Sequence, residues 1–468
     1  MIEVEQLIGG VWAQGSGAQR FVVVSPVDGT AVSRAPVAAE ADVAAAVKAA
    51  REAQPGWART PASARAAALH RAADAVAGDI DRLAGIMTAE MGKPLDGARG
   101  SIEAGVGTLR QYAELGPVHR GRALAGDDEA IDLMAYQPRG VVAAITPWND
   151  PVAVSCGLLG AALVTGNTVV YKPSERTPAT GAALARLLAD HLPEGVLSML
   201  TGAGEVGAAL SAAEVDLVAH VGSTATGRAI AATCARTGAK ALLENGGSDP
   251  LIVDGDVDPG WAARQAALGA FANSGQICVA VERIYLHRAV AGPFLDELVR
   301  EATRWATDLG PLVDARHRDL VHAQVDAAVT AGARLLHGGR LPDGPGAFYP
   351  PTVLADCTDE MDVMAQETFG PVAPVMVVES FDEALSRACR SPYGLAGTVL
   401  TGSMSHAQRA WRELPVGTVK VNAVFGGAPG GAAHPRRGSG QGFGYGPELL
   451  DEMTVTKAVH LQGPPAGW

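Results

Sequence analysis

Val141-Val142-Ala143-Ala144-Ile145 is a run of five apolar residues that opens a new pattern in this 468-residue sequence. Similar short runs, typical of β-strands, follow it and alternate with Ala- and Leu-rich stretches typical of helices. The runs are Thr168–Lys172, Val196–Leu200, Leu217–Val221 and Leu251–Val253, and the stretches between them include Ala179–Leu192, Val206–Ala213 and Gly227–Thr237. This alternation predicts a parallel, doubly wound sheet, whose ligands bind beyond the carboxyl ends of the strands.

A second series of alternating elements begins near residue 261 and predicts a second α/β unit. Helices are expected over Trp261–Ala272, Pro293–Thr307, Leu320–Ala331 and Phe381–Cys389, and strands over Val281–His287, near Leu335, and over Pro374–Val378, Gly397–Thr401 and Gly417–Asn422. The Gly-, Pro- and Arg-rich residues 425–446 predict a long loop. Pro464–Trp468 is expected to form a loosely held tail.

The first 115 residues predict a largely helical segment. Apolar residues recur at helical spacing over 41–54 and 63–80, after strand and turn signals around Phe21–Ser25 and Asp28-Gly29. The chain is longer than a single typical core, so two or three domains are expected.

The charge of the chain argues against nucleic-acid binding. The formal net charge is −13, and an acidic surface repels phosphate backbones. The sequence shows neither an uninterrupted apolar run of membrane-spanning length nor a signal peptide, so no membrane partner is expected. The five cysteines are widely spaced and lack a Cys-x-x-Cys pair, which predicts reduced thiols in a cytoplasm and no metal site.

Three short turn-rich segments carry the residues from which covalent chemistry can be built. Cys278 follows the polar run Asn273–Gln276, Glu244 lies 34 positions upstream (278 − 244 = 34), and Asn149 follows Pro147-Trp148. Taken singly, these residues are equally consistent with a buried apolar thiol, a helix-cap or salt-bridge carboxylate, and a turn residue. Together they predict a nucleophile, a base and an oxyanion donor.

Two glycine-containing turns are candidates for holding a phosphate. Gly202–Gly207 matches the dinucleotide fingerprint G-x-G-x-x-G, but the next strand ends in Gly222-Ser223 without the expected acid. The alternative for Gly202–Gly207 is close packing of a strand on a helix. The turn at Gly222-Ser223 also opens a helix, whose backbone amides and hydroxyls can hold a pyrophosphate, or Ser223 can simply cap the helix.

Lys172 and Glu175 close a predicted strand three residues apart. They can clamp two ribose hydroxyls, or they can be surface charges beside a turn. A carboxylate at this place would repel a 2′-phosphate, so NAD is favoured over NADP.

Taken together and in order, these segments resemble the aldehyde dehydrogenase superfamily, in its NAD(P)-dependent, non-acylating branch. The resemblance spans nearly the whole chain. Its motifs are Ile8–Trp12, Glu90–Pro94, Pro147–Asn149, Gly166–Thr168, Lys172–Glu175, Gly222–Thr224, Glu244–Gly247, Gly275–Cys278 and Glu367–Pro371. The step of 34 residues from Glu244 to Cys278 fits the family's spacing of base and nucleophile.

The resemblance implies oxidation of an aldehyde to a carboxylic acid with NAD, with NADP a weaker candidate. It implies that Cys278 is the nucleophile, Glu244 the general base and Asn149 the side-chain part of the oxyanion hole. The cofactor residues that it implies are Lys172 and Glu175 at the adenosine ribose, Gly222 and Ser223 at the pyrophosphate, Glu367 at the nicotinamide ribose, Phe369 at the nicotinamide, and Trp148.

The same resemblance implies two doubly wound α/β domains, a Rossmann-like coenzyme domain and a catalytic domain, plus a β-arm for oligomerisation. The coenzyme domain is expected over 1–121 and 140–246, and the catalytic domain over 247–438. The arm and C-terminal segment are expected over 122–139 and 439–468, joining copies into a homodimer or homotetramer.

The sequence departs from the family pattern near the substrate. Asp150 follows the Trp-Asn pair where the family has an aromatic or apolar residue, and Asn245 and Ser248 replace a Leu and a Lys. The C-terminal loop reads Pro429–Pro435 instead of the usual glycine-and-lysine motif. Asp150, Ile277, Val279 and the 423–438 loop are expected to line the substrate pocket, where an acid can favour a polar or cationic substrate or can be paired with another group.

Two other classes of function remain open from the residues alone. A cofactor-independent thiol esterase or hydrolase would use Cys278 and Glu244, but it leaves the phosphate-type turns unexplained. A catalytically idle binding protein on the same scaffold would not need the three chemical residues, all of which are present.

Overall fold

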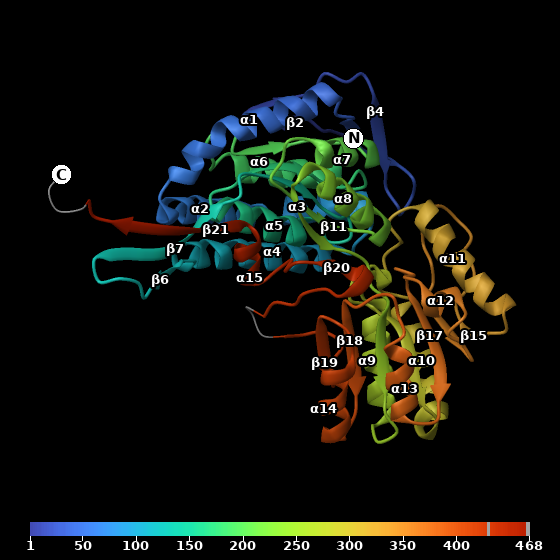
Figure 1. The fold of residues 1–468 in the computed structure, drawn as a ribbon. Coiled ribbons are helices and arrows are strands. Elements are labelled where there is room, and N and C mark those ends of the chain that lie inside the picture. Colours follow the sequence, from blue (N-terminus) through green and yellow to red (C-terminus); the bar gives the residue numbers. More distant parts are fainter. Residues whose placement is uncertain (428–430, 465–468) are drawn as a thin grey trace.

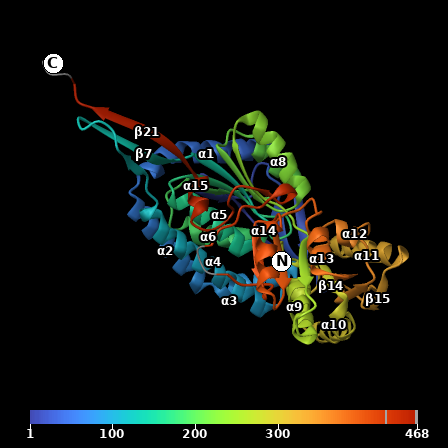
Figure 2. The ribbon, with the colours of Figure 1, turned by 60° about the horizontal axis from the view of Figure 1, so that its bottom comes forward.

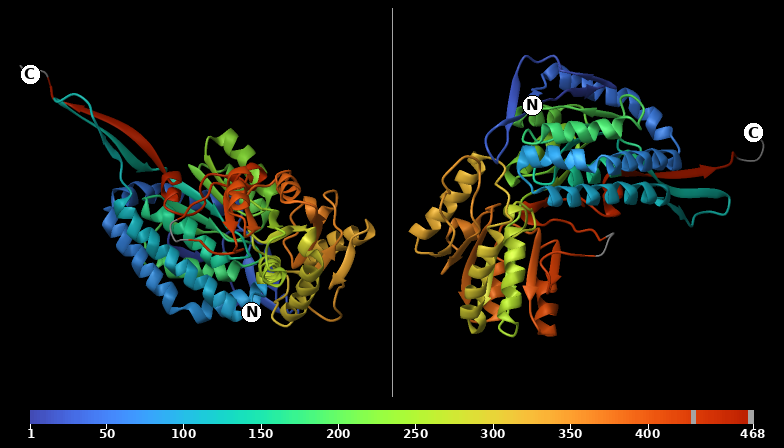
Figure 3. Two further views of the ribbon diagram at one scale, coloured as in Figure 1. Left: turned by 90° about the horizontal axis from the view of Figure 1, so that it is seen from below. Right: turned by 180° about the vertical axis from the view of Figure 1, so that it is seen from behind.

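The computed structural model describes residues 1–427 and 431–464. A sheet of eight strands lies above a sheet of seven strands in Figure 1, and a three-stranded arm extends away from the first (Figures 1 and 3). The α/β fold class with two sheet-based units is therefore confirmed. Two predicted features fall on residues outside the described ranges, namely positions 429–430 of the C-terminal loop motif and positions 465–468 of the tail.

The first sheet has the strand order of a doubly wound fold. Its strands are β20 (Gly440–Gln441), β12 (Lys240–Glu244), β11 (Leu217–Val221), β8 (Val141–Ile145), β9 (Thr168–Lys172), β10 (Leu197–Met199), β2 (Gln6–Ile8) and β3 (Val11–Ala13). Strands β12, β11, β8, β9 and β10 run parallel. The chain proceeds from β8 to β10 in one direction and from β11 to β12 in the other. The switch point for ligands therefore lies between β8 and β11.

Helices cover both faces of this sheet. One face carries α1 (Glu40–Arg59), α7 (Gly204–Ala212) and α8 (Thr224–Thr237), and the other carries α2 (Ala62–Gly78), α3 (Ile80–Met91), α4 (Leu95–Leu115), α5 (Pro151–Val164) and α6 (Pro178–Ala189). Figure 2 shows α1 and α8 on the side opposite α2, α3 and α4. Helix α5 is buried nearly all round because it lies between the sheet and α4. The helix expected over 63–80 is α2, which ends at Gly78, and Ile80 is already the first residue of α3.

The second sheet is also mostly parallel. Its order is β15 (Arg334–His337), β16 (Thr352–Ala355), β17 (Val372–Val378), β14 (Val281–His287), β13 (Asp249–Val253), β18 (Ala396–Leu400) and β19 (Thr418–Val421), with β15 antiparallel. Helices α9 (Pro259–Phe271) and α10 (Ala291–Trp305) pack on one face, and α11 (Ala315–Thr330), α12 (Asp362–Ala365), α13 (Phe381–Ala388) and α14 (Met404–Glu413) pack on the other.

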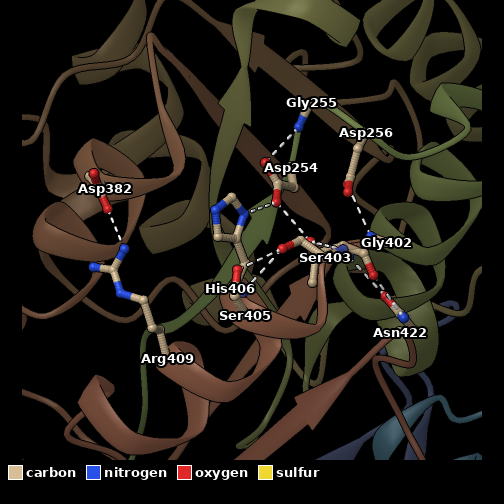
Figure 4. A network of polar contacts seen from close by, with 11 residues as sticks. Asp254, Gly255, Asp256, Asp382, Gly402, Ser403, Ser405, His406, Arg409 and Asn422 are labelled. Carbon is tan, nitrogen blue, oxygen red and sulfur yellow. Dashed lines mark hydrogen bonds and ion pairs between the residues drawn. The ribbon is translucent and has the colours of Figure 1, made fainter.

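The carboxyl edge of the second sheet is closed by a polar network at its own switch point, between β13 and β18 (Figure 4). Asp254, which follows β13, accepts hydrogen bonds from Thr401 Oγ1 at 2.7 Å and from the Gly255 N–H at 2.8 Å, and it pairs with His406. Asn422 exchanges two hydrogen bonds with the Thr401 backbone. These groups satisfy one another's hydrogen bonds. The opposite, amino edge of this sheet faces the first sheet.

The arm consists of β6 (Arg122–Leu124), β7 (Ala130–Pro138) and β21 (Thr454–Gln462), paired antiparallel in the order β21-β7-β6. The segment that leads to β21 returns first to the unit of the eight-stranded sheet: β20 pairs with β12, and α15 (Glu448–Glu452) packs near α5. A small N-terminal sheet contains β1 (Ile2–Glu3), β5 (Ala31–Pro36) and β4 (Arg20–Val24). Over the described ranges, no helix is long and apolar enough to cross a membrane.

Candidate active site

A cavity of about 400 Å³ lies where the carboxyl edge of the first sheet meets the amino edge of the second. Eight of the ten predicted site residues line it: Cys278, Glu244, Asn149, Trp148, Gly222, Ser223, Glu367 and Phe369. The other two, Lys172 and Glu175, do not line this cavity. Among the expected substrate residues, Asp150 and Ile277 line the cavity, whereas Val279 does not.

Strand ends account for this convergence. Asn149 follows β8, Ser223 follows β11 and Glu244 is the last residue of β12, so all three lie at the carboxyl edge of the first sheet. The second sheet contributes its amino edge, because Cys278 precedes β14 and the segment Glu367–Phe369 precedes β17. Residues far apart in the chain therefore face one space.

A strained turn holds the thiol. Asn273, Ser274 and Gly275 have φ values of 50°, 57° and 72°, three consecutive residues in the left-handed region. A Cβ at position 275 would collide with the carbonyl oxygen of Gly370, so only glycine fits there. Ser274 Oγ donates to the Gly310 carbonyl at 2.7 Å and fixes the turn. Strain of this kind persists where the surrounding structure holds it, as at functional sites.

The Asn149 carboxamide lies against the same turn. Its Nδ2 donates a hydrogen bond of 3.0 Å to the carbonyl of Gln276, two residues before Cys278. An amide nitrogen carries two N–H donors, so one remains for an oxygen in the cavity. Asn273 Nδ2 donates to the same carbonyl at 3.0 Å, which keeps the loop and Asn149 in register.

The surroundings of Cys278 disfavour the thiolate. Burial is the main cause that raises the pKa of this thiol to about 12, and the charges of Glu244, Asp249 and Glu367 raise it further. The thiol is partly exposed. Without a ligand, the side chain is therefore a neutral thiol at physiological pH.

Glu244 has the properties of a base that works near neutrality. Burial raises its pKa to about 7, and a hydrogen bond from the Gly444 backbone opposes that shift. A Cβ at position 444 would overlap the Glu244 carboxylate, so the C-terminal loop covers this carboxylate only because residue 444 is glycine. Gly444 thus forms a wall beside the base, and the short strand β20 lies just before it in the chain.

A second carboxylate that was not predicted positions the Glu367–Phe369 turn. Glu282 is buried at the start of β14 and accepts hydrogen bonds from the backbone N–H of Thr368 at 3.0 Å and of Phe369 at 2.7 Å. Glu367 Oε1 in turn accepts from the Gly247 N–H at 3.0 Å. Nothing in the sequence singles out Glu282, because an acid inside an apolar strand acquires this role only when β17 packs beside β14.

An aromatic cluster forms another wall. Trp148 and Phe369 meet edge to face with ring centroids 5.5 Å apart, and His317 packs against both. Arg176 lies over Trp148 at 5.1 Å and pairs with Asp314 at 2.8 Å. His317 and Arg176 line the cavity but were not predicted, since neither belongs to a motif.

Polar groups gather at the carboxyl ends of β9 and β11. Lys172 is buried at the end of β9, where its Nζ donates to the Pro173 carbonyl at 3.0 Å and keeps further N–H groups for a ligand. Glu175 is half-buried nearby. Ser223 caps α8 by accepting from the Thr226 N–H at 3.3 Å. Thr224 Oγ1 is buried and has no hydrogen-bond partner among the described residues, as expected of a group that awaits a ligand.

The Gly202–Gly207 fingerprint serves packing. Gly202 has a φ of 146°, and a Cβ there would collide with the Val206 side chain, so this glycine allows β10 to turn tightly into α7. Gly207 lies against the aliphatic stem of Lys172. The packing interpretation of this motif therefore accounts for its geometry.

Known proteins share both the sequence and the shape of this chain. The sequence profile of the aldehyde dehydrogenase family matches residues 12–459. A 3,6-anhydro-alpha-L-galactose dehydrogenase from Streptomyces coelicolor is 37% identical over 97% of this chain and 96% of its own length. A 3,6-anhydro-L-galactose dehydrogenase solved in complex with NADP matches at a TM-score of 0.95 and 32% identity, over 98% of this chain and 100% of that one.

An indole-3-acetaldehyde dehydrogenase solved with NAD+ matches at a TM-score of 0.96 and 32% identity, over 99% of this chain and 97% of that one.

Replacing Glu244 with Gln should speed alkylation of Cys278 by iodoacetamide when no ligand is bound. The Glu244 charge raises the pKa of the thiol, and the thiolate fraction grows about tenfold for each unit by which that pKa falls. We expect roughly a two- to tenfold faster reaction at pH 8, measured by mass spectrometry of the Cys278 peptide.

The background for this measurement is Cys389→Ser, because Cys389 is the other partly exposed thiol. The matched control is Glu103→Gln, an exposed carboxylate on α4. Slower alkylation in Glu244→Gln would contradict the electrostatic account, because Glu244 would then be the proton acceptor of the resting thiol.

Proposed function

The chain belongs to the aldehyde dehydrogenase family and oxidises an aldehyde to a carboxylic acid with NAD, and we propose that Cys278, Glu244 and Asn149 carry out this reaction. The observation that supports these roles is their convergence, from three separate segments, on one cavity that five of the seven predicted cofactor residues also line. Neither the cofactor-independent hydrolase nor the idle binding protein finds support in the cavity or in the relatives.

In the first step, the Cys278 thiol releases its proton to solvent water, its sulfur forms a bond to the aldehyde carbon, and the electron pair of the carbonyl π bond moves to the oxygen, which becomes an oxyanion. The free N–H of the Asn149 carboxamide and the backbone N–H of Cys278 hold this oxyanion. Loss of one such donor costs about 2.7–4 kcal/mol of barrier. When bound, NAD supplies a positively charged ring that offsets the acids around the thiol, and it accepts the hydride from the former aldehyde carbon. The acyl group then remains on the sulfur as a thioester.

In the second step, Glu244 takes a proton from a water molecule, which attacks the thioester carbon. The carbon–sulfur bond breaks, the carboxylic acid leaves and Cys278 is restored. A pKa of about 7 suits this role, since the carboxylate is then both available and basic enough near neutral pH.

Glu244→Gln should produce one equivalent of NADH rapidly and then stall, because acyl transfer to Cys278 survives while hydrolysis of the thioester loses its base. We expect the steady-state rate to fall by about a hundredfold or more, measured at 340 nm after rapid mixing with aldehyde and NAD. In the wild-type enzyme, the steady-state rate should decline below pH 7, where Glu244 becomes protonated.

Full steady-state turnover by Glu244→Gln would refute the assigned role. Mass spectrometry of the stalled variant provides the companion measurement, since the acyl group should be found on Cys278 and on no other cysteine.

Lys172 and Glu175 are proposed to bind the two hydroxyls of the adenosine ribose. The support is their place after β9, together with the unused N–H groups of Lys172. A carboxylate at this position repels a 2′-phosphate and so favours NAD over NADP.

Glu175→Ala should lower the ratio of kcat/KM with NAD to kcat/KM with NADP by about tenfold, because it removes both a hydrogen-bond acceptor and a repulsive charge. Glu205→Ala is the control, since it removes another carboxylate that acts on Lys172. A wild-type preference for NADP would overturn the assignment of Glu175.

We also propose that the three-stranded arm joins copies of the chain. Leu124, Ile131, Val455 and Leu461 expose large apolar side chains on this ribbon, which extends away from the first sheet and its helices (Figure 3). Domain roles follow the predicted boundaries, with residues 1–121 and 140–246 binding the cofactor and 247–438 carrying the nucleophile. A cytoplasmic location is inferred from the five free thiols.

Ile131→Lys combined with Leu461→Glu should convert the oligomer to a monomer in light scattering after size-exclusion chromatography. These residues face each other across β7 and β21, so the opposite charges preserve their pairing while the apolar contact surface is lost. Met404→Lys, on an exposed position of α14, is the control. If the double variant keeps the oligomeric mass of the wild type, the proposal that the arm joins copies of the chain is wrong.

A further inference from the structure

Asp150 stands at the N-cap of α5 but does not cap it. Aspartate is among the residues most favoured at this position because its oxygens accept the first free N–H groups of a helix. Here the side chain accepts no hydrogen bond from α5. The carboxylate turns instead toward α4, where Ser101 Oγ donates to its Oδ1. The Asp150 carboxylate is therefore oriented by its contact with α4 and not by capping of α5.

A buried lysine faces the same carboxylate oxygen. Lys93, just before α4, has a side chain only 8% exposed, and its Nζ lies 3.9 Å from Asp150 Oδ1. At this distance the Lys93 ammonium and the Asp150 carboxylate form an ion pair, but they are too far apart for a hydrogen bond. Among the described residues, the Lys93 ammonium has no hydrogen-bond acceptor, so its three N–H groups are available to a ligand. Burying an ammonium is costly unless such partners are supplied.

Both side chains line the catalytic cavity, and Asp150 is the direct neighbour of Asn149 in the chain. The Asp150 side chain is 36% exposed, and its second oxygen is free to accept a hydrogen bond. Val154 and Ile277 provide apolar surface in the same cavity. The wall therefore offers one acceptor and several donors beside the apolar side chains of Val154 and Ile277.

The balance of charge decides which ligands this wall suits. Asp150 and Lys93 neutralise each other, so the pair gives no net attraction to a cationic or an anionic aldehyde. A hydroxyl group both donates and accepts, and it can bridge a carboxylate and an ammonium. Neutral hydroxylated substrates are thus the class that this pair can recognise.

We propose that Asp150 and Lys93 form a hydroxyl-recognising pair, and that the substrate is a neutral aldehyde with hydroxyl groups close to its carbonyl. This inference rests on the proposed function, because the pair lies beside the atoms that hold the aldehyde oxygen. A site built to bind a hydroxyl discriminates strongly against the analogue that lacks it, since the polar groups of the site are then left without partners.

The experiment compares glyceraldehyde with propanal, which has the same three-carbon chain without hydroxyls. The ratio of kcat/KM for the two aldehydes, read as NADH formation, is measured in the wild type, Asp150→Leu and Lys93→Met. Asp96→Leu is the matched control, since Asp96 is an exposed acid on α4 outside the cavity. Changes of this ratio between variants cancel the different intrinsic reactivities of the two aldehydes.

We expect the glyceraldehyde-to-propanal ratio to fall about tenfold or more in Asp150→Leu and in Lys93→Met, and to stay unchanged in Asp96→Leu. An unchanged ratio in either folded cavity variant, verified by its melting temperature, would overturn the proposal and leave the pair a merely structural link between α4 and α5. If Asp150→Leu does not fold, Lys93→Met decides the question alone.

Two further substrates complete the test with the wild-type enzyme. A higher kcat/KM for an aldehyde with a trimethylammonium group, or for one with a terminal carboxylate, than for glyceraldehyde would overturn the neutral-hydroxyl assignment. Failure of the proposed function is distinguishable, because an enzyme without the Cys278 chemistry would oxidise none of these aldehydes.

Discussion

The left-handed turn over Asn273–Gly275 is the constraint on which the site depends. Gly275 lets the nucleophile loop lie directly on the backbone of Gly370, and no larger residue would fit. This contact joins the segment before β14 to the segment before β17, so the thiol and the Glu367–Phe369 turn keep a fixed relation. Glu282 strengthens the same junction, because its two carboxylate oxygens accept hydrogen bonds from backbone N–H groups of the Glu367–Phe369 turn. The amino edge of the second sheet thereby becomes a rigid surface facing the first.

The electrostatics of this surface explain why the Cys278 thiol stays protonated and unreactive when no ligand is bound. Glu244, Asp249 and Glu367 surround Cys278, and together with burial they hold its proton. Burial also raises the pKa of these acids, to about 7 for Glu244 and Glu367 and about 8 for Asp249. Near neutral pH these acids are therefore only partly ionised. Their partial charge raises the pKa of the Cys278 thiol, but the thiolate can still form when the positively charged ring of NAD is bound. The same burial gives Glu244 the pKa that a base for thioester hydrolysis requires near neutral pH.

Sequence periodicity predicted the scaffold well where strands are buried on both faces. β8, β9, β11 and β14 have the predicted bounds because each is rich in apolar or β-branched residues and is buried along nearly its whole length inside a sheet. β12 was missed although it ends at Glu244, since its sequence starts with a lysine and only Leu242 and Leu243 are buried well. Its neighbour on the outer side is the two-residue β20, in which Gln441 pairs with Leu243 from 198 residues away (441 − 243 = 198), so the sequence around β12 carries no local signal of this pairing.

The sequence by itself determined the α/β class and the residue types of a thiol, a carboxylate and a carboxamide in ordered motifs, because these follow from local periodicity and from short segments. Only the tertiary structure decided what Glu282, His317 and Arg176 do, why the Gly202 fingerprint serves packing, and that Asp150 is paired with Lys93. Each of these depends on which distant segments touch. The pKa of Cys278 is likewise set by burial and by neighbouring charges, and both depend on the tertiary structure and not on the local sequence.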